Sequence, residues 1–270
     1  MKKYLALLLA AAMGCSLLAG CGGDTEPAPE DNAEETALVY AVEAGSAGEA
    51  AAKENGFEYN SVASQGDALM EVASGTSDAA IIDLLMAGAM IGENTSYPDL
   101  VTGEELTTEE YGAGCRQESD LTAYINWVMA EAYADGTMQT IAETYGVQAA
   151  LVEQAAMEEP EIAADGDIAY IQDKGTLVVG ITNFEPMDFK DENGEWIGFD
   201  ADMARLVAEK LGVTVEFVEI DWDNKIMELD SKNIDVVWNG MTLTPEVTAA
   251  MNCTNAYCNN AQVVILPAAE

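Results

Sequence analysis

Residues 177–217 read LVVGITNFEPMDFKDENGEWIGFDADMARLVAEKLGVTVEF. The apolar run at 177–182 predicts a strand, and FDADMARLVAEKLG predicts an amphipathic helix that Gly212 ends. Asp200 is the expected N-cap of this helix, because its short side chain can accept a hydrogen bond from an amide of the first turn. Residues 213–217 alternate apolar and polar side chains, which predicts the next strand. This order of strand, helix and strand indicates an α/β fold with a largely parallel sheet.

The amino-terminal half contains a second unit of the same kind. Residues 38–42 predict a short strand that leads into a glycine turn at 45–48 and then a helix. Residues 65–74 carry apolar side chains at helical spacing, and the apolar run 79–82 reads as a buried strand. Asp83 follows at the carboxyl end of that strand. The chain therefore contains two α/β units.

The two units echo each other locally. The segment MELDSKNIDVVW at 227–238 overlays MEVASGTSDAAI at 70–81 with identity at four of twelve positions. In this overlay Gly240 matches Asp83. Because ligands of open α/β sheets bind beyond the carboxyl ends of the strands, we expect Asp83 and Gly240 to face one cleft between two lobes.

Two helices and a connector lie between the units. Residues 120–133 predict an amphipathic helix, and a second helix ends before Gly146. Residues 147–167 contain Pro160, Gly166 and six acidic side chains, a composition typical of a connector. About twenty extended residues reach up to roughly 66 Å, so this segment can join distant points of two lobes.

The amino terminus predicts export. Lys2 and Lys3 precede an apolar run, and Leu18-Ala19-Gly20-Cys21 resembles a lipobox with cleavage before Cys21. We therefore expect residues 1–20 to be a lipoprotein signal peptide, with Cys21 lipidated and anchored to the membrane by its acyl chains. A membrane helix over residues 4–20 is the alternative, although it is short for a span. Residues 21–37 predict a disordered acidic tether.

Composition excludes several functions. The chain has 49 Asp and Glu against 10 Lys and Arg, a net charge of −39, which argues against binding nucleic acid. It has no histidine, which removes Ser-His-Asp and Cys-His catalysis and imidazole zinc sites. No cofactor or metal ion is expected. An exported chain could form a disulfide between Cys253 and Cys258, and this pairing stays open. Cys115 is the third thiol, and three thiols cannot all pair internally.

Eight motifs together resemble the family-3 extracellular solute-binding proteins, the polar-amino-acid receptors of ABC importers, over 38–266. They are LVVGITNFEPMDF, ENGEWIGFDADMARLVAEKLGV, DVVWNGMTLTPE, AQVVIL, AVEAGSAGEAAAKENG, SDAAIID, EEYGAG and ADGTMQTIAETYG. The resemblance implies a two-lobed, type II periplasmic-binding-protein-like fold with a hinge. Family members run from the LVVGIT-like strand to the DGT helix, whereas here the second lobe and closing helices come first, so the order looks circularly permuted.

This permuted order defines the expected domains. Lobe 2 comprises residues 38–113 with 264–270, and its last segment should lie beside 38–42. Residues 114–146 form a return strand and helices that pack on lobe 1, residues 147–167 are the connector, and lobe 1 is 168–263. Chain ends that are close in space make such a permutation tolerable. The expected state is a monomer, and a dimer that swaps lobes between two chains is the alternative.

The resemblance implies a ligand site between the lobes. Phe184 and Trp222 match the aromatic side chains that sandwich the ligand. Gly240 and Thr242 would supply backbone groups and a hydroxyl, and Asp83 matches the carboxylate that grips an α-ammonium group. The turn around Ser46 precedes a helix, and its N–H groups could hold an anion such as an α-carboxylate.

Two positions depart from the family pattern. Val247 stands where amino-acid receptors commonly have the arginine that clamps the ligand carboxylate, so that bidentate contact is lost. Glu43 stands where Lys or Gln is common and adds a negative charge. We therefore hypothesise a cationic or neutral amine-bearing ligand, or an amino acid whose carboxylate is held by backbone N–H groups alone.

The expected function is ligand capture for an ABC importer, with an ABC permease, its ATPase and the membrane as partners, and the chain is not expected to be an enzyme. A dehydratase-like enzyme on the same fold is the alternative, with Asp83, Glu185 and Asp188 as acid or base. A sensory module for a membrane receptor is a further alternative.

Overall fold

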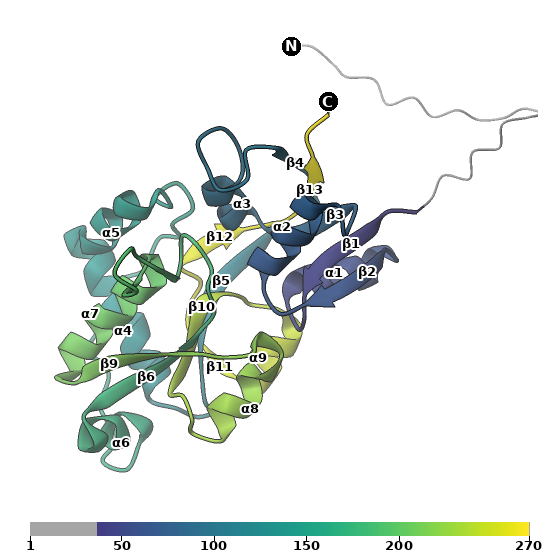
Figure 1. Cartoon of the computed structure of the whole chain (residues 1–270). Coiled ribbons are helices and arrows are strands. Elements are labelled where there is room, and N and C mark those ends of the chain that lie inside the picture. Colours follow the sequence, from purple (N-terminus) through teal and green to yellow (C-terminus); the bar gives the residue numbers. More distant parts are fainter. Residues whose placement is uncertain (1–36, 270) are drawn as a thin grey trace, which may run out of the picture. The chain divides into compact units, whose positions relative to one another are not determined.

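The computed structural model describes residues 37–269. Cys21, the signal peptide and nearly all of the tether lie outside the described residues. Two sheets organise the chain, and each is the centre of one lobe. The lobe 2 sheet has the order β2-β1-β3-β13-β4, and the lobe 1 sheet has the order β11-β5-β10-β6-β9, with β12 also paired to β5 (Figure 1). This confirms the expected two-lobed α/β fold.

Secondary structure follows the chain in this order. The strands are β1 (Val39–Glu43), β2 (Glu58–Val62), β3 (Ala79–Asp83), β4 (Leu100–Glu105), β5 (Glu109–Cys115), β6 (Thr176–Ile181), β7 (Phe189–Lys190), β8 (Trp196–Ile197), β9 (Thr214–Glu219), β10 (Val236–Thr242), β11 (Asn252–Cys253), β12 (Cys258–Asn260) and β13 (Gln262–Pro267). The helices are α1 (Ala47–Asn55), α2 (Gln65–Ser74), α3 (Leu84–Met90), α4 (Leu121–Asp135), α5 (Thr137–Tyr145), α6 (Asp167–Lys174), α7 (Phe199–Leu211), the 3₁₀ turn η1 (Trp222–Asn224), α8 (Lys225–Asp230) and α9 (Pro245–Ala250). Among the described helices, none is long and apolar enough to cross a bilayer.

The two sheets share one topology. In lobe 2, β1 pairs in parallel with β2 and β3, and β13 pairs antiparallel with β3. In lobe 1, β6 pairs in parallel with β9 and β10, and β5 pairs antiparallel with β10. Each lobe therefore has three parallel strands followed by one antiparallel strand.

The antiparallel strand of each lobe comes from the other half of the chain. Figure 1 shows the yellow β13 among blue and purple strands, and the blue-green β5 beside the yellow-green β10. The chain thus crosses between the lobes at residues 106–108 and again at Ala261. The crossings are tied together, because Leu106 N donates to Gln262 O at 2.8 Å and Gln262 N donates to Thr107 Oγ1 at 2.8 Å.

The crossings set the ends of the strands. The sequence suggested lobe boundaries after residue 113 and before residue 264, whereas β5 begins at Glu109 and β13 begins at Gln262. The last segment of the chain was expected beside residues 38–42. It shares a sheet with them but is not directly beside them, which corrects that expectation. Ile265 pairs with Ala80, whose strand separates β13 from β1. Two strand spacings of about 4.8 Å each place these segments about 10 Å apart.

Asp200 is not the N-cap that the sequence suggested. Helix α7 begins at Phe199, two residues earlier than an Asp200 cap would give, and Gly198 takes the cap position with φ 130°. A Cβ on Gly198 would lie 2.1 Å from Met187 O, so the tight approach of the two chain segments requires glycine. Asp200 is consequently buried, and its Oδ2 accepts a hydrogen bond from Gly240 N at 2.6 Å.

The suggested disulfide between Cys253 and Cys258 is absent from the described chain, where both cysteines are free. Cys253 lies opposite Gly114 of β5, and Cys258 lies opposite Tyr111 of the same strand. Three residues of strand separate their positions by about 10 Å and turn their side chains to opposite faces. A disulfide needs Cα atoms within about 7 Å, so this strand pairing prevents the bond.

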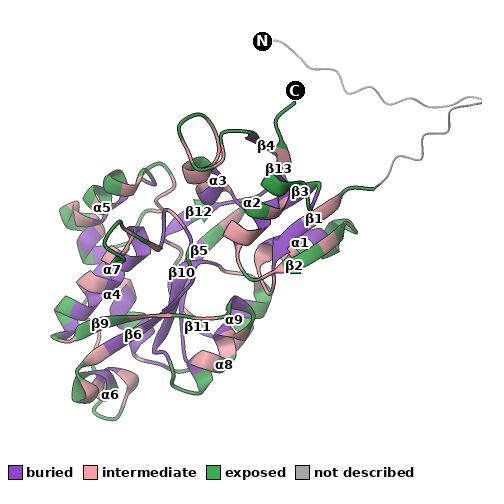
Figure 2. Cartoon of the chain, viewed as in Figure 1, coloured by how far each residue is buried: buried purple, intermediate pink, exposed green. Residues whose placement is uncertain are grey.

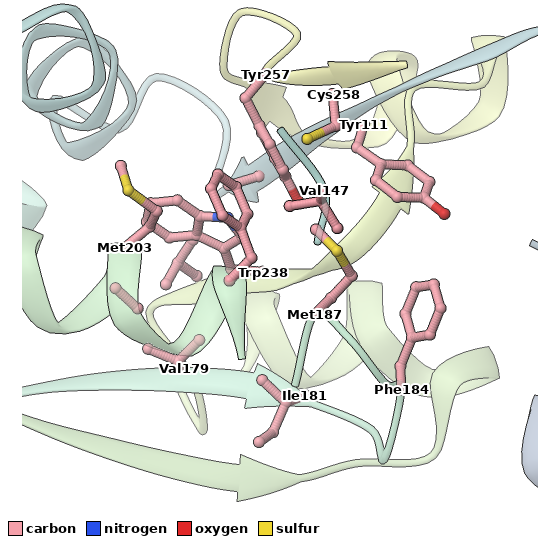
Figure 3. Packing of buried hydrophobic residues seen from close by; sticks show 14 of the residues in the cluster. Tyr111, Val147, Val179, Ile181, Phe184, Met187, Met203, Trp238, Tyr257 and Cys258 are labelled. Atoms are coloured by element: carbon pink, nitrogen blue, oxygen red, sulfur yellow. The ribbon is translucent and has the colours of Figure 1, made fainter. Parts of the chain in front are cut away.

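The core of lobe 1 lies on both faces of its sheet. Val236 and Trp238 of β10 point into the larger cluster, toward α4 and α7, whereas Val237 and Met241 point into the smaller cluster. Figure 3 shows Trp238 beside Tyr257 in the larger cluster, and the ring centroids are 6.3 Å apart. Figure 2 shows buried strands enclosed by helices with exposed outer faces. The alternation on β10 follows from the period of two that a strand imposes on its side chains.

A buried ion network fastens the connector's end to lobe 1. Arg116 follows β5, and its Nε lies 3.0 Å from Asp167 Oδ2 at the start of α6. Its Nη1 donates to Ile234 O at 2.8 Å, and its Nη2 lies 3.4 Å from Asp235 Oδ1. Lys174 of α6 pairs with the other oxygen of Asp235. One guanidinium thus joins β5, α6 and the segment before β10.

We expect Arg116→Leu to lower the free energy of unfolding by about 3–5 kcal/mol, because it leaves buried charges and carbonyl oxygens without their partner. The control is Lys190→Leu, which breaks an exposed pair with Glu219 and should cost about 0–1 kcal/mol. Urea unfolding of both variants measures the difference. Equal effects would contradict a special role for the buried network.

Candidate functional site

A cavity of about 520 Å³ is lined by residues of both lobes. All seven ligand-site residues expected from the sequence line it. Those from lobe 2 are Glu43, Ser46 and Asp83, and those from lobe 1 are Phe184, Trp222, Gly240 and Thr242. The carboxyl ends of β1, β3 and β10 therefore converge on one space, as the overlay of the two units suggested.

Phe184 and Gly240 form one wall of the cavity. Gly240 has φ 55°, and a Cβ at this position would lie 2.3 Å from Phe184 Cε1. Glycine is therefore required both by the left-handed backbone and by the ring above it. The Phe184 ring packs edge-on to Tyr111, with ring centroids 6.3 Å apart. Figure 3 shows the two side chains near each other. Trp222, which begins η1, is also buried and lines the same cavity.

Asp83 stands at the crossing of the two chain segments. Its Oδ1 accepts hydrogen bonds from Tyr111 OH at 2.6 Å, from Gln262 Nε2 at 3.0 Å and from Asn260 Nδ2, and its Oδ2 accepts one from Gln65 Nε2. These donors come from β5, β13, β12 and α2. A carboxylate has about four lone-pair sites, so a ligand ammonium would compete with donors already in place.

Ionisation of Asp83 costs free energy in these surroundings. Burial, together with the nearby Glu109 charge, raises the pKa of Asp83 to about 7. The carboxylate of Glu109 itself accepts hydrogen bonds from Thr242 Oγ1 at 3.0 Å and from Gln262 Nε2 at 3.0 Å. Thr242 is therefore oriented by the strand that enters from the other half of the chain.

Glu43 is the unsatisfied carboxyl of the cavity wall. It ends β1, only 3% of its surface is exposed, and its Oε1 has no hydrogen-bond partner among the described residues. Burial, together with the nearby Asp83 charge, raises the pKa of Glu43 to about 8, and Lys225 opposes this shift. A buried acceptor without a donor is unusual in a folded protein and calls for a physical explanation.

Lys225 is a cavity residue that the sequence reasoning missed. It is buried, and its Nζ donates to Gly45 O in lobe 2 at 2.9 Å and to Trp222 O at 3.1 Å. The ammonium also lies 4.8 Å from the centroid of the Trp222 ring. Its position three residues after Trp222 in a helical segment was the available signal, because such residues share one face. Lys225 therefore bridges the lobes across the cavity.

The predicted anion site at the Gly45–Gly48 turn is partly filled by the chain itself. Ser46 caps α1, and its Oγ accepts a hydrogen bond from Glu49 N at 3.1 Å. The Glu49 carboxylate accepts from Gly45 N at 3.2 Å and pairs with Lys53 at 2.9 Å. A ligand carboxylate at this turn would meet the Glu49 charge.

The charged residues that line the cavity are mostly acidic. Val247, the position at which the resemblance implies an arginine, lines the cavity, and no arginine is found among the described lining residues. The acidic lining residues are Glu43, Glu49, Asp83, Asp223 and Glu246, and the basic ones are Lys53 and Lys225. The cavity therefore suits a cation better than an anion.

The alternative catalytic carboxyls are mostly elsewhere. Among Asp83, Glu185 and Asp188, all within the described chain, Asp83 alone lines the cavity. Asp188 is fully buried, and both of its oxygens lack hydrogen-bond partners among the described residues. Its neighbour Asp200 accepts hydrogen bonds from Gly240 N at 2.6 Å and Tyr257 OH at 2.7 Å. Asp188 and Asp200 thus form a buried acid pair behind Gly240.

Burial raises the pKa of both acids, to about 7 for Asp200, and the Asp200 charge raises that of Asp188 further. Unfolded carboxyls lose their protons near pH 4, so between about pH 4 and 7 the folded state binds more protons and stability falls as pH rises. We expect Asp188→Asn to make the loss of unfolding free energy between pH 5 and 8 smaller by at least about 1 kcal/mol.

Urea unfolding at several pH values tests this expectation, with Asp165→Asn as the control on an exposed carboxyl. A pH dependence in Asp188→Asn that matches both the wild type and the control would show that the pair ionises freely in the folded protein.

Residues 177–270 match the family model described as "Bacterial extracellular solute-binding proteins, family 3". The L-cystine-binding protein TcyJ of Escherichia coli (strain K12) is 37% identical over 93 residues, which cover 34% of this chain and 35% of that protein. The probable ABC transporter arginine-binding protein ArtJ of Chlamydia trachomatis is 42% identical over 70 residues, covering 26% and 27%. The chain thus spans about a third of the length of these curated relatives.

Among solved structures, an ancestral cationic amino acid solute-binding protein, AncCDT-1, is 44% identical. The match covers 31% of this chain and 37% of that chain, with a TM-score of 0.31.

Proposed function

We propose that this chain, a family-3 extracellular solute-binding protein by its residues 177–270, captures an amino acid or a related small amine in the inter-lobe cavity for an ABC importer. The observation that carries the proposal is the convergence of seven expected ligand-site residues from two lobes on one cavity. Small-molecule sites are typically concave and lie between domains, with aromatic side chains and convergent polar groups that orient the ligand.

The two crossing segments provide the hinge. Lobe 1 and lobe 2 are joined at residues 106–108 and at Ala261, beside which Asp83 and Gln262 form hydrogen bonds. Rotation about such short segments closes two rigid lobes on a ligand. The closed form would then be recognised by the membrane permease, and a separate ATPase would supply the energy of transport.

The ligand is a cation or carries an amine. The acidic lining and Val247 in place of the family's arginine both disfavour a ligand that depends on its carboxylate. Phe184 and Trp222 would hold its apolar part, while Gly240 and Thr242 would hydrogen-bond its polar groups. In the wider family, names of relatives include cystine-, arginine- and histidine-binding proteins.

The circularly permuted order belongs to the same proposal. It is supported by the position of the family match, which begins at the LVVGIT strand and ends at the carboxyl end of the chain. It is also supported by the pairing of Ile265 with Ala80 and of Ala80 with Ala41, which brings the new ends of the chain close together. Residues 147–167 would be the joint between the original ends.

Anchoring completes the proposal. Secretion with the signal peptide 1–20 and lipidation of Cys21 would hold the protein outside the cell at the membrane surface, close to its permease. We expect the mature protein to be a monomer with a complete cavity in each chain.

Ligand binding can be tested by mass spectrometry of copurified small molecules followed by a thermal-shift screen. A ligand at 100 times its dissociation constant stabilises the fold by about 2.7 kcal/mol, so the shift should be easily measured. We expect amines and basic amino acids to give the largest shifts, and Trp222→Ala to abolish them. Trp127→Ala, outside the cavity, should keep them. The largest shifts from acidic amino acids would contradict the charge argument.

The permuted order can be tested by reversing it. A chain that runs from residue 166 to 270, through a glycine-rich linker, and then from 38 to 154 keeps the contacts of Asp167 and Gln154, so it should fold as a monomer and bind the same ligand. The linker has to span only about two strand spacings, or about 10 Å. A dominant dimer on size-exclusion chromatography would favour lobes swapped between two chains, and failure to fold would contradict the permuted order.

A further inference from the structure

We infer that Glu43 is the residue that receives the cationic nitrogen of the ligand, and that the ligand displaces a proton held by Glu43. This inference rests on the proposed function, because it concerns the same cavity. It assigns to Glu43 the role that the family resemblance gives to Asp83. It also narrows the ligand to an amine or amidine cation.

The first step is the contrast between the two carboxyls. Asp83 accepts hydrogen bonds from Tyr111, Gln262, Asn260 and Gln65, all donated by the protein. Glu43 is equally buried and lines the cavity, but its Oε1 has no partner among the described residues. The Gln65 amide also faces Glu43, but its Nε2 donates to Asp83 Oδ2, so a donor brought by the ligand would satisfy the free Oε1 of Glu43.

The second step is that Lys225 does not already fill this role. Its Nζ donates to the carbonyl oxygens of Gly45 and Trp222 and lies over the Trp222 ring. The lysine is therefore held by neutral acceptors on the cavity wall. It lessens the negative potential at Glu43 but leaves that carboxyl free to bind a second cation.

The third step concerns the ligand's other groups. Val247 cannot bind a carboxylate, and Gly45 N, which could help to do so, donates to Glu49. An α-carboxylate would therefore enter a space that also contains the charges of Glu49 and Asp223. An amine that lacks a carboxylate avoids this repulsion, so we expect it to bind at least as tightly as the matching amino acid.

The fourth step is proton balance. The groups that face Glu43 are Asp83 on β3, Asp67 on α2 and Lys225 on α8, and burial with the Asp83 charge raises the pKa of Glu43 to about 8. At pH 7 the carboxyl therefore holds a proton. When a ligand ammonium arrives, this proton leaves to solvent and the carboxylate accepts a hydrogen bond from the ammonium. Affinity should consequently rise with pH from 6.5 to 8.5.

The experiment is calorimetric titration with two matched pairs of probes, cadaverine with L-lysine and agmatine with L-arginine. Each member of a pair differs from the other only by the α-carboxyl group. Titrations at pH 7 in phosphate and in Tris count the protons released, because the two buffers differ in their heat of ionisation. We expect close to one proton per cadaverine or agmatine, and roughly tenfold or greater tightening between pH 6.5 and 8.5.

The variants are Glu43→Gln and the control Glu54→Gln, which removes an exposed charge of the same lobe. Glutamine resembles the protonated carboxyl, so Glu43→Gln should fold, and its melting temperature verifies this. We expect it to abolish proton release and to weaken amine binding at pH 8.5 by about tenfold or more. Glu54→Gln should behave as the wild type does.

Binding by the wild type without proton release would overturn the inference, and this measurement needs no variant. Equal affinity of Glu43→Gln and wild type at pH 8.5 would also overturn it. If the amino acids bind and their decarboxylated partners do not, the proposed function stands and the inference fails. If none of the four probes binds, the inference fails as well, and the copurified ligand then decides the proposed function independently.

Discussion

Each of the two large sheets depends on an interior strand that the other half of the chain provides. β5 lies between β10 and β11, and β13 lies between β3 and β4. A missing central strand would leave unpaired backbone N–H and C=O groups on both of its neighbours, which is costly where water is excluded. Neither half of the chain can therefore complete its own lobe. The exchange therefore ties the two lobes together through the short segments between the exchanged strands.

The same exchange explains where the buried charges lie. Glu109 begins β5 and Gln262 begins β13, so the two crossings bring polar side chains to one point beside the cavity. Asp83 is bound there by donors from both crossings, and its pKa rises to about 7. In the hinge motion proposed above, rotation of the lobes would change the surroundings of this carboxyl. Lobe movement and the ionisation of Asp83 would then be linked by geometry.

Local patterns predicted the fold well because the elements involved are strongly periodic and end at glycine. Residues 65–74 are α2 residue for residue, and β3 was predicted to within one residue. The predictions that failed are those in which a tertiary contact overrides a local pattern. Asp200 has the side chain of an N-cap, but the close contact between Gly198 and Met187 O starts the helix earlier and buries it. Cys253 and Cys258 are close in sequence, but their pairing with β5 separates them. Propensity and spacing contain no information about either contact.

The cavity was predictable in its members but not in its charge balance. Asp83 and Gly240 follow buried strands, and that placement alone predicts convergence at a sheet edge. Lys225 could not be assigned in this way, because its partners are carbonyl oxygens of Gly45 and Trp222 and leave no trace in the side-chain pattern. The Lys225 ammonium offsets part of the negative potential of the acidic lining, although it is held at the cavity wall by those carbonyl oxygens.

In the site proposed above, selectivity would arise from an acceptor that the protein leaves unsatisfied. A molecule without a donor at this point would leave the buried Oε1 of Glu43 unpaired, and a neutral or anionic molecule would not offset the charge of an ionised Glu43. A cation removes that cost while it makes its own contacts. The site would then discriminate against other ligands because they leave the buried Glu43 oxygen unpaired and so bind with less favourable free energy. Other sites reject analogues in the same way, by leaving buried polar groups unpaired. An arginine clamp would select for a ligand carboxylate. Val247 and Glu43, in a site built on the same fold, would instead favour a cation.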